Sequence, residues 1–318
     1  MSIAASLRNL LTAAVLVAAT PAFATESPDL AVHPDLAVHK VAENVYALVG
    51  PLEQRSPANL GNNATFGAVV TDAGVILIDS GGSARGAQAI EAALASVTDQ
   101  PVSVVINTGG QDHRWFGNAY FKAKGARIIA SEAAVADQTE RGDGQFAVMR
   151  TLIGEDGVAG TTLSHAPETF ADALEVTIGS TRLELRKVGP AHTPGDSFVW
   201  LPDQRVVFTG DIVYVDRMLG VGPQSDSRTW LEAFAAIAAL KPAHVVPGHG
   251  RATDLAQAER ETRDYLIHLR AKVGAVLEAG GDETAAASVD QAAFSHLAVF
   301  DEISRRNAQQ VFMQMEWE

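Results

Sequence analysis

Residues 75–82 read Val-Ile-Leu-Ile-Asp-Ser-Gly-Gly, and residues 107–113 read Asn-Thr-Gly-Gly-Gln-Asp-His. A run of Val and Ile typical of a buried strand begins the first stretch and directly precedes the second. Polar residues and glycines follow each run. A scaffold commonly carries its catalytic and binding groups on such loops. The two stretches therefore predict a β-rich scaffold with a functional site at one sheet edge.

Three later loops show the same pattern, at residues 189–196, 209–211 and 247–250. Gly or Pro flanks nearly every His and Asp in them, which lets the chain turn sharply. A single such residue is more simply explained as a helix cap or a loop side chain. Several of them at strand ends favour a metal site, because imidazole and carboxylate groups bind zinc, iron and manganese. The candidate ligands are Asp112, His113, His192, Asp211 and His249.

The order of the expected elements indicates two sheets. Strands come in two batches, each trailed by helices, and the chain from residue 255 on is mainly helical. This order suggests two sheets packed face to face with helices outside. The expected strands span 45–49, 68–71, 75–79, 102–107, 127–130, 174–178, 181–186, 197–201, 206–209 and 244–246, and the expected helices span 84–96, 117–124, 132–149 and 228–240.

The beginning of the chain is typical of an export signal. Arg8 precedes a short apolar run at 10–19, and Ala22-Phe23-Ala24 provides a small-residue cleavage site. The apolar run is too short to span a bilayer, so an uncleaved membrane anchor is the less favoured alternative. We expect residues 1–24 to be a signal peptide and the mature protein to be periplasmic.

A hexapeptide, Pro-Asp-Leu-Ala-Val-His, follows the expected signal and occurs twice in succession, at 28–33 and 34–39. Two histidines on an exposed segment make a poor metal site without further ligands, so a local duplication is the simpler interpretation. We expect residues 25–40 to be a flexible leader. Nothing suggests a domain break after it, so residues 41–318 are expected to form a single domain.

The composition excludes several classes of protein. The chain has 318 residues, of which 47% are apolar, and this fraction excludes a disordered chain. Its 38 acidic residues outnumber 24 basic ones, for a formal charge of −14, which argues against binding to nucleic acid. It has no cysteine, hence no disulfide and no thiol ligand or nucleophile. His and Asp alone would have to hold a metal.

The order of these motifs resembles the metallo-β-lactamase-fold superfamily, from about residue 41 to the end of the chain. The stretches that carry the resemblance are 75–81, 107–113, 192–196, 208–211 and 246–250. The resemblance implies a mixed α/β fold, a four-layer αββα sandwich with the metal site at one edge. Within the superfamily the chain is most similar to exported "quinoprotein relay" zinc metallohydrolases, which are related to hydrolases of sulfur-oxidation clusters. Residues 111–118, 214–220 and 306–312 support that similarity.

The chain departs from the family pattern in one loop. The usual loop is His-x-His-x-Asp-His, and its first two histidines help to hold one of two metals. Here those two positions are Thr108 and Gly110. The resemblance therefore implies one metal ion, with zinc expected and iron or manganese not excluded. The implied ligands are Asp112, His113 and His249, with Asp211, while His192 remains from the other site.

Hydrolysis is the function that this site predicts best. We expect a zinc-dependent hydrolase of an ester, thioester or lactam-like bond in a small molecule, with Asp112 and His192 as catalytic groups. Asp79 and Asp196 are expected to support the motif loops by hydrogen bonds. The alternative is a weakly catalytic or non-catalytic accessory protein that binds a metal or a quinone-type cofactor for a periplasmic quinoprotein dehydrogenase.

Overall fold

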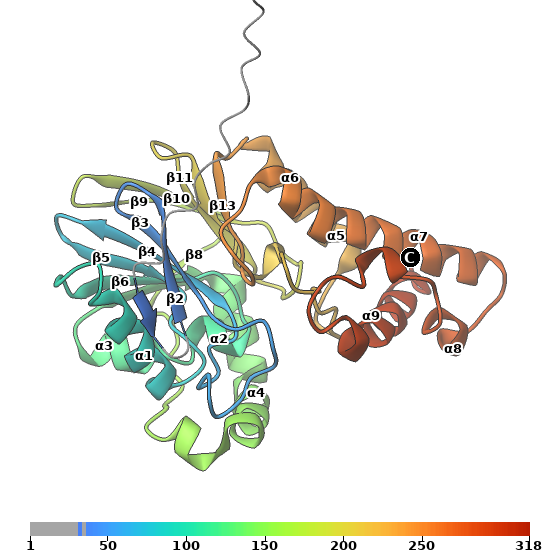
Figure 1. Ribbon diagram of the computed structural model, residues 1–318, viewed down its shortest axis with the longest axis horizontal. Coiled ribbons are helices and arrows are strands. Elements are labelled where there is room, and N and C mark those ends of the chain that lie inside the picture. The colour runs from blue at the N-terminus through green and yellow to red at the C-terminus, as the bar shows by residue number, and fades with distance from the viewer. Residues whose placement is uncertain (1–30, 34–35) are drawn as a thin grey trace, which may run out of the picture.

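Two β-sheets form the centre of the protein, and helices cover them (Figure 1). The computed structural model describes residues 31–33 and 36–318, so the expected signal peptide lies outside the described residues. One sheet has eight strands in the order β1 to β8, and the other has five in the order β13-β12-β11-β10-β9. The predicted mixed α/β sandwich of two sheets and helices is confirmed.

The first half of the chain builds the eight-stranded sheet and its helices. The strands are β1 (Ala31–His33), β2 (Leu36–Ala42), β3 (Val45–Val49), β4 (Thr65–Thr71), β5 (Gly74–Ile78), β6 (Val102–Asn107), β7 (Arg127–Ser131) and β8 (Glu168–Phe170). The helices are α1 (Ala84–Leu94), α2 (Asp112–Trp115), α3 (Asn118–Ala123) and α4 (Glu132–Val158).

The second half builds the five-stranded sheet and a group of helices at the C-terminal end. The strands are β9 (Ala173–Ile178), β10 (Thr181–Lys187), β11 (Ser197–Leu201), β12 (Val206–Phe208) and β13 (His244–Val246). The helical segments are η1 (Gly210–Ile212), α5 (Ser227–Ala239), α6 (Leu255–Ala258), η2 (Glu259–Arg263), α7 (Asp264–Glu278), α8 (Glu283–Ala286), η3 (Ala292–Phe294) and α9 (Phe300–Met315).

Strand β5 shows why the first quoted stretch determines the fold. Its side chains alternate between the two faces of the sheet. Ile76 and Ile78 pack into the core between the sheets, whereas Val75 and Leu77 pack into the core under the helices. A strand that is buried on both faces has an unbroken apolar sequence, as this one does. The loop that follows β5 therefore begins at the edge of a fully covered sheet.

Residues 36–40 of the expected flexible leader over 25–40 form part of a strand, which corrects that expectation for them, while residues 25–30, 34 and 35 lie outside the described residues. Residues 36–40 belong to β2, which pairs antiparallel with β3, because Leu36 and Val38 alternate inward and are buried in the core under the helices. Strand β1 pairs with β2 in turn. Pairing and burial of this kind hold the segment in the sheet.

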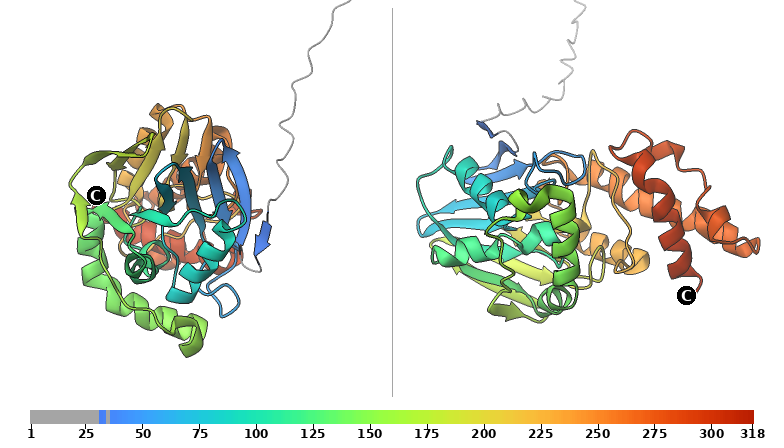
Figure 2. Two further views of the ribbon diagram at one scale, coloured as in Figure 1. Left: turned by 90° about the vertical axis from the view of Figure 1, so that its left-hand side faces the viewer. Right: turned by 90° about the horizontal axis from the view of Figure 1, so that it is seen from below.

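The C-terminal helices extend the molecule beyond the sandwich. Helices α7, α8 and α9 project past the end of the sheets (Figures 1 and 2). They share one apolar core with α5 and the outer face of the second sheet, in which Trp230, Tyr265 and Val311 are fully buried. Among the described residues, no helix combines the length and the apolar character needed to cross a membrane.

Candidate metal centre

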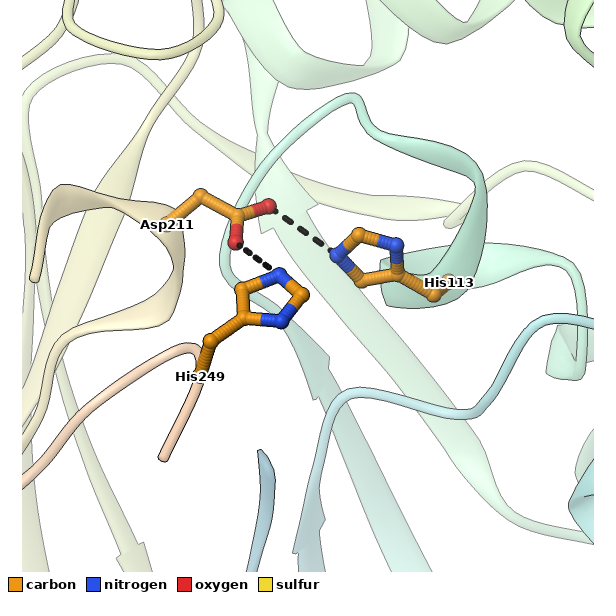
Figure 3. Close-up of side chains that lie close together, drawn as sticks. All are labelled: His113, Asp211 and His249. Atoms are coloured by element: carbon orange, nitrogen blue, oxygen red, sulfur yellow. Dashed lines mark hydrogen bonds and ion pairs between the residues drawn. The ribbon is translucent and has the colours of Figure 1, made fainter. Parts of the chain in front are cut away.

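Three of the predicted ligands meet in one buried cluster (Figure 3). His113 Nε2 lies 3.2 Å from Asp211 Oδ2, and His249 Nε2 lies 3.2 Å from Asp211 Oδ1. One donor atom from each residue lies within 4.8 Å of the other two. Two imidazoles and a carboxylate match a common donor set of zinc, with room for a fourth ligand.

The ends of three strands bring these side chains together. His113 is in α2, just after β6, while Asp211 and His249 follow β12 and β13. Strands β12 and β13 are parallel neighbours, so their carboxyl ends lie side by side. The Gly248 carbonyl accepts a hydrogen bond from the Thr65 N–H at 2.7 Å, which ties this edge to the first sheet. The parallel pairing of β12 and β13 therefore explains why the loops with Asp211 and His249 lie at the same edge.

His113 has a hydrogen-bond partner in either neutral form. Its Nδ1 lies 2.8 Å from Arg55 Nη2 and 3.1 Å from Asp112 Oδ1. An unprotonated Nδ1 accepts from Arg55, and a protonated Nδ1 donates to Asp112. The second form leaves Nε2 unprotonated, as a metal ligand requires. Its surroundings therefore permit His113 to bind a metal through Nε2.

His249 is held by stacking. Its ring lies 4.6 Å from the Tyr214 ring at an angle of 15°. Burial keeps the pKa of His249 well below its usual value, although Asp211 acts in the opposite direction. The ring is therefore neutral, as a ligand must be, and its buried Nδ1 has no hydrogen-bond partner in the described part of the chain.

Arg114 is the main residue of the site that our sequence reasoning gave no role. Its buried guanidinium donates to Asp211 Oδ1 at 2.7 Å and Oδ2 at 3.1 Å, and to Asp79 Oδ2 at 3.0 Å. Burial would raise the pKa of Asp211, but Arg114 and then His113 hold it well below its ordinary value. The carboxylate at the centre of the cluster is therefore ionised. The signal in the sequence was an arginine directly after His113, within the stretch 111–118 that supports the family resemblance.

Asp79 and Asp196, the two predicted supporting residues, hydrogen-bond the motif loops. Asp79 accepts from the Thr108 N–H at 2.7 Å and from the Thr108 hydroxyl. Asp196 accepts from the Thr193 N–H at 2.7 Å and from the Thr193 hydroxyl. Burial raises the pKa of Asp79 despite Arg114, and it raises the pKa of Asp196 to about 7.

Asp112 lies beside the cluster and outside the group of three donors. Its Oδ1 accepts from Arg55 Nε at 3.1 Å, and it also accepts from the His113 N–H at 2.7 Å. Burial would raise the pKa of Asp112, but Arg55 and His113 lower it well below the ordinary range. Arg55 was absent from our sequence analysis, since nothing local links it to a motif 57 residues away.

His192 faces the same pocket from another side. Its Nδ1 lies 3.0 Å from the Gly220 carbonyl, which can only accept, so Nδ1 carries the proton. Burial lowers the pKa of His192 to about 4, so the ring is neutral near pH 7. Its Nε2 is therefore unprotonated, which suits a proton acceptor better than a donor to an oxyanion.

Helix α4 occupies the side-chain space at Gly110, one of the two positions that lack the histidines of the family pattern. A Cβ atom on Gly110 would lie 1.7 Å from Asp137 Oδ2 of this helix, so no side chain fits there. Gln145 Nε2 donates to the Gly110 carbonyl at 2.9 Å, and Gln138 Nε2 donates to the Gly109 carbonyl at 3.1 Å. The loop is therefore held by α4 in a form that has no room for the second histidine of the usual pattern.

A pocket of about 360 Å³ opens over the cluster. Its wall includes the rings of His113, His192 and His249 together with Tyr214. The wall also includes side chains from the loop before β4, the segment after η1, and α9. These further lining residues include Gln54, Arg55, Asn63, Gln111, Arg217, Gln224, Ile303, Arg306 and Gln310.

Known proteins share parts of this sequence. Over 185 residues the chain is 29% identical to 2,4-dinitroanisole O-demethylase subunit alpha of Nocardioides sp. (strain JS1661), covering 57% of this chain and 51% of that protein. Over 232 residues it is 22% identical to a linear primary-alkylsulfatase of Pseudomonas sp. (strain ATCC 19151), covering 62% and 44%. The chain thus spans about half the length of these curated relatives.

A solved structure shares the fold. The metallo-beta-lactamase from Pontibacter korlensis aligns over 73% of this chain and 99% of its own, with a TM-score of 0.57 and 22% identity. The family model of the metallo-beta-lactamase superfamily matches residues 61–249, from the loop before β4 to His249. That range contains β4 to β8 of the first sheet, the whole second sheet, and every residue of the cluster. On this match, the chain belongs to the metallo-beta-lactamase superfamily.

Proposed function

We propose that the protein is a periplasmic hydrolase with one metal ion, zinc foremost, bound by His113, Asp211 and His249. Its substrate would be a small molecule with an ester, thioester or lactam-like bond. The observation that carries the proposal is the buried His-Asp-His cluster beneath an open pocket. The superfamily includes hydrolases and binds metal ions, typically zinc, which supports a metal-dependent reaction here.

The residues of the cluster fit one ion. His249 is neutral, His113 has a partner for the form that leaves Nε2 free, and Asp211 is ionised. Arg114 fixes the Asp211 carboxylate from behind, as residues around metal ligands commonly do. When bound, a zinc ion supplies a Lewis acid that polarises a carbonyl and lowers the pKa of water.

The pocket residues supply proton transfer and orientation. We assign the proton acceptor to His192 Nε2, because Gly220 holds the proton on the other ring nitrogen. We assign to Asp112 the orientation of His113 and Arg55 rather than direct ligation, since its Oδ1 is already engaged by both. This modifies the ligand and catalytic roles that the sequence motif predicted for Asp112 and His192.

A second candidate is an accessory protein that binds a metal or quinone-type cofactor for a periplasmic quinoprotein partner. Two features favour it. Arg114 and Arg55 place two positive charges beside the cluster, which opposes a divalent cation. The room for a second metal-binding histidine is filled by Asp137. The resemblance to quinoprotein-relay proteins points the same way.

Metal content and turnover on the same samples test the proposal. The purified full chain would be assayed by mass spectrometry for metals. It would then be tested with p-nitrophenyl acetate, a thioester, nitrocefin and a p-nitrophenyl sulfate ester, with and without EDTA. We expect about one zinc per chain and EDTA-sensitive turnover of one bond class. His249→Ala should lower metal content by about tenfold or more, because a ligand is lost.

His244→Ala is the matched control, because His244 is exposed at the start of the strand that leads to His249. It should retain the metal and the turnover of the wild type. Full metal content in His249→Ala would overturn the ligand assignment. Bound metal without turnover on any substrate would overturn the hydrolase and support the accessory role.

A further inference from the structure

The charge of the pocket is opposite to the charge of the chain. The protein has a formal charge of −14. Yet, among the described residues, those that line the pocket include Arg55, Arg217 and Arg306, and no Asp or Glu. Amide side chains supply most of the other polar groups. In an acidic protein, a pocket wall without carboxylates and with several guanidinium groups indicates selection for a negatively charged ligand.

Arg217 is the first of two cations that have no acidic partner. Its side chain is buried, and its Nε donates to the Leu52 carbonyl at 2.6 Å. In the described ranges no carboxylate forms an ion pair with it, and Asp211 and Glu302 act only over longer distances. Burial lowers the pKa of Arg217. A buried, unpaired charge is costly to a fold, so its presence at a pocket favours an anion that binds there.

Arg306 is the second cation without an acidic partner; unlike Arg217 it is exposed, and it comes from a different part of the chain. It lies on α9 three residues after Ile303 and four before Gln310, so that one face of the helix lines the pocket. Arg306 forms no ion pair within residues 36–318. The adjacent Arg305 lines a separate hollow beside Phe300, away from the cluster.

Asn307 joins the two chain segments that carry Arg217 and Arg306 on the pocket wall. Its Nδ2 donates to the Leu219 carbonyl at 2.7 Å, and its Oδ1 accepts from the Val221 N–H at 2.8 Å. These bonds fasten α9 to the segment that carries Arg217. In addition, the Met218 N–H donates to the Ala298 carbonyl at 3.1 Å, just before α9. The two segments that carry Arg217 and Arg306 are therefore joined by buried hydrogen bonds of the fold.

We propose that this pocket binds a small molecule through an oxyanion, a carboxylate or a sulfate-type group, held by Arg217 and Arg306. Guanidinium groups recognise both kinds of oxyanion through paired hydrogen bonds. The proposal rests on the proposed function, because it places the bond to be hydrolysed between this anion and the His113–Asp211–His249 cluster. It assigns the appended helix α9 a direct part in substrate recognition.

Binding of simple probes tests the proposal without any turnover. Benzoate, benzenesulfonate and the neutral benzyl alcohol would be titrated calorimetrically into the full chain at constant ionic strength. The titrations would be done on protein as purified and after EDTA treatment. We expect at least one anion to bind with or without metal, and the neutral probe not to bind. The stronger of the two anions identifies the carboxylate or the sulfate-type ligand.

Arg306→Gln should weaken binding of that anion by about tenfold, the loss of one charge-assisted contact. Arg217→Lys keeps the positive charge but removes the paired donors of the guanidinium, and Arg217→Gln removes the charge as well, so the two variants separate the two contributions to anion binding. Circular dichroism would confirm that each variant folds. Arg305→Gln, which removes the same charge one residue away, should bind like the wild type.

Equal weakening in Arg305→Gln and Arg306→Gln would overturn the proposal, because it would show only a general effect of charge. Anion binding that disappears with EDTA and is indifferent to Arg306 would overturn it as well, since the metal alone would then hold the ligand. Binding of the anion by a protein that hydrolyses nothing would sustain the pocket and refute only the hydrolase.

Discussion

Single residues determine the charge balance at the cluster. Arg114 lies between the carboxylates of Asp79 and Asp211, and all three side chains are buried. Burial opposes the charge on each of them. Pairing with Arg114 holds the pKa of Asp211 well below its usual value, whereas burial raises the pKa of Asp79 despite the same arginine. The Arg114 guanidinium also donates to the carbonyls of Thr65 and Gly248, at 3.1 and 2.9 Å. One arginine therefore joins both sheets and sets the orientation of Asp211.

Arg114→Met should lower the free energy of unfolding by about 3–5 kcal/mol, because it leaves two buried carboxylates without their cation. Urea denaturation followed by circular dichroism measures this loss. Arg127→Met is the matched control. It breaks the exposed Arg127–Glu168 pair at 2.7 Å and should cost less than about 1 kcal/mol. A similar small loss in both variants would contradict the role assigned to Arg114.

At the scale of elements, helix α4 and the loop at 108–111 explain why the metal loop departs from the family pattern. Asp137 of this helix occupies the space of a side chain at Gly110, and Gln138 and Gln145 donate hydrogen bonds to the carbonyls of Gly109 and Gly110. Arg141 pairs with Asp137 one turn along the helix and keeps its carboxylate in place. The glycine at position 110, where the family has a histidine, and the packing of α4 against the loop therefore depend on each other.

Gly110→Ala should lower the free energy of unfolding by about 1–3 kcal/mol, because its Cβ would overlap Asp137 Oδ2. The cost should shrink in an Asp137→Ala background, which removes the overlapping atoms. A double-mutant cycle by urea denaturation measures this coupling. Gly144→Ala on the same helix has no atom within 4 Å of its new Cβ and should be neutral or stabilising, by up to about 1 kcal/mol. Equal costs of Gly110→Ala in both backgrounds would refute the packing argument.

At the scale of the whole molecule, the C-terminal helices convert a sheet-edge cluster into a walled pocket. They project beyond the end of the sheets and share a core with α5 and the second sheet (Figure 1). Residues of α9 also line the pocket. Asn307 is the buried connection between α9 and the segment after η1. The shape of the pocket therefore depends on how the appended helices dock.

Asn307→Ala should leave the Leu219 carbonyl and the Val221 N–H without partners and cost about 1–3 kcal/mol. Hydrogen exchange followed by mass spectrometry should show faster exchange over residues 217–222, as the segment loses its anchor. Gln309→Ala, on an exposed face of α9, removes a bond to Glu283 and should change stability by less than about 0.5 kcal/mol. Unchanged exchange in Asn307→Ala would mean that other contacts hold the segment.

The sequence by itself determined the sandwich and the positions of the motif loops. Strands such as β5 are visible because their apolar runs are local and continuous, and His113, Asp211 and His249 are visible because each directly follows a strand. The same local reasoning misjudged the leader, where the alternation of Leu36 and Val38 outweighs the repeated polar residues. The zinc ion, the periplasmic location and the reaction remain predictions.

Only the tertiary structure decided which charges meet. The pairing of Arg55 with Asp112 spans 57 residues, and that of Arg114 with Asp211 spans 97. That Arg306 and Arg217 line the same pocket depends on the docking of a helix at the far end of the chain. Local periodicity reports which face of an element is buried, but not which buried or pocket-facing groups come into contact. Those contacts follow from how sheets and helices pack, and they place the His113–Asp211–His249 cluster and the arginines of α9 and of the segment after η1 around one pocket.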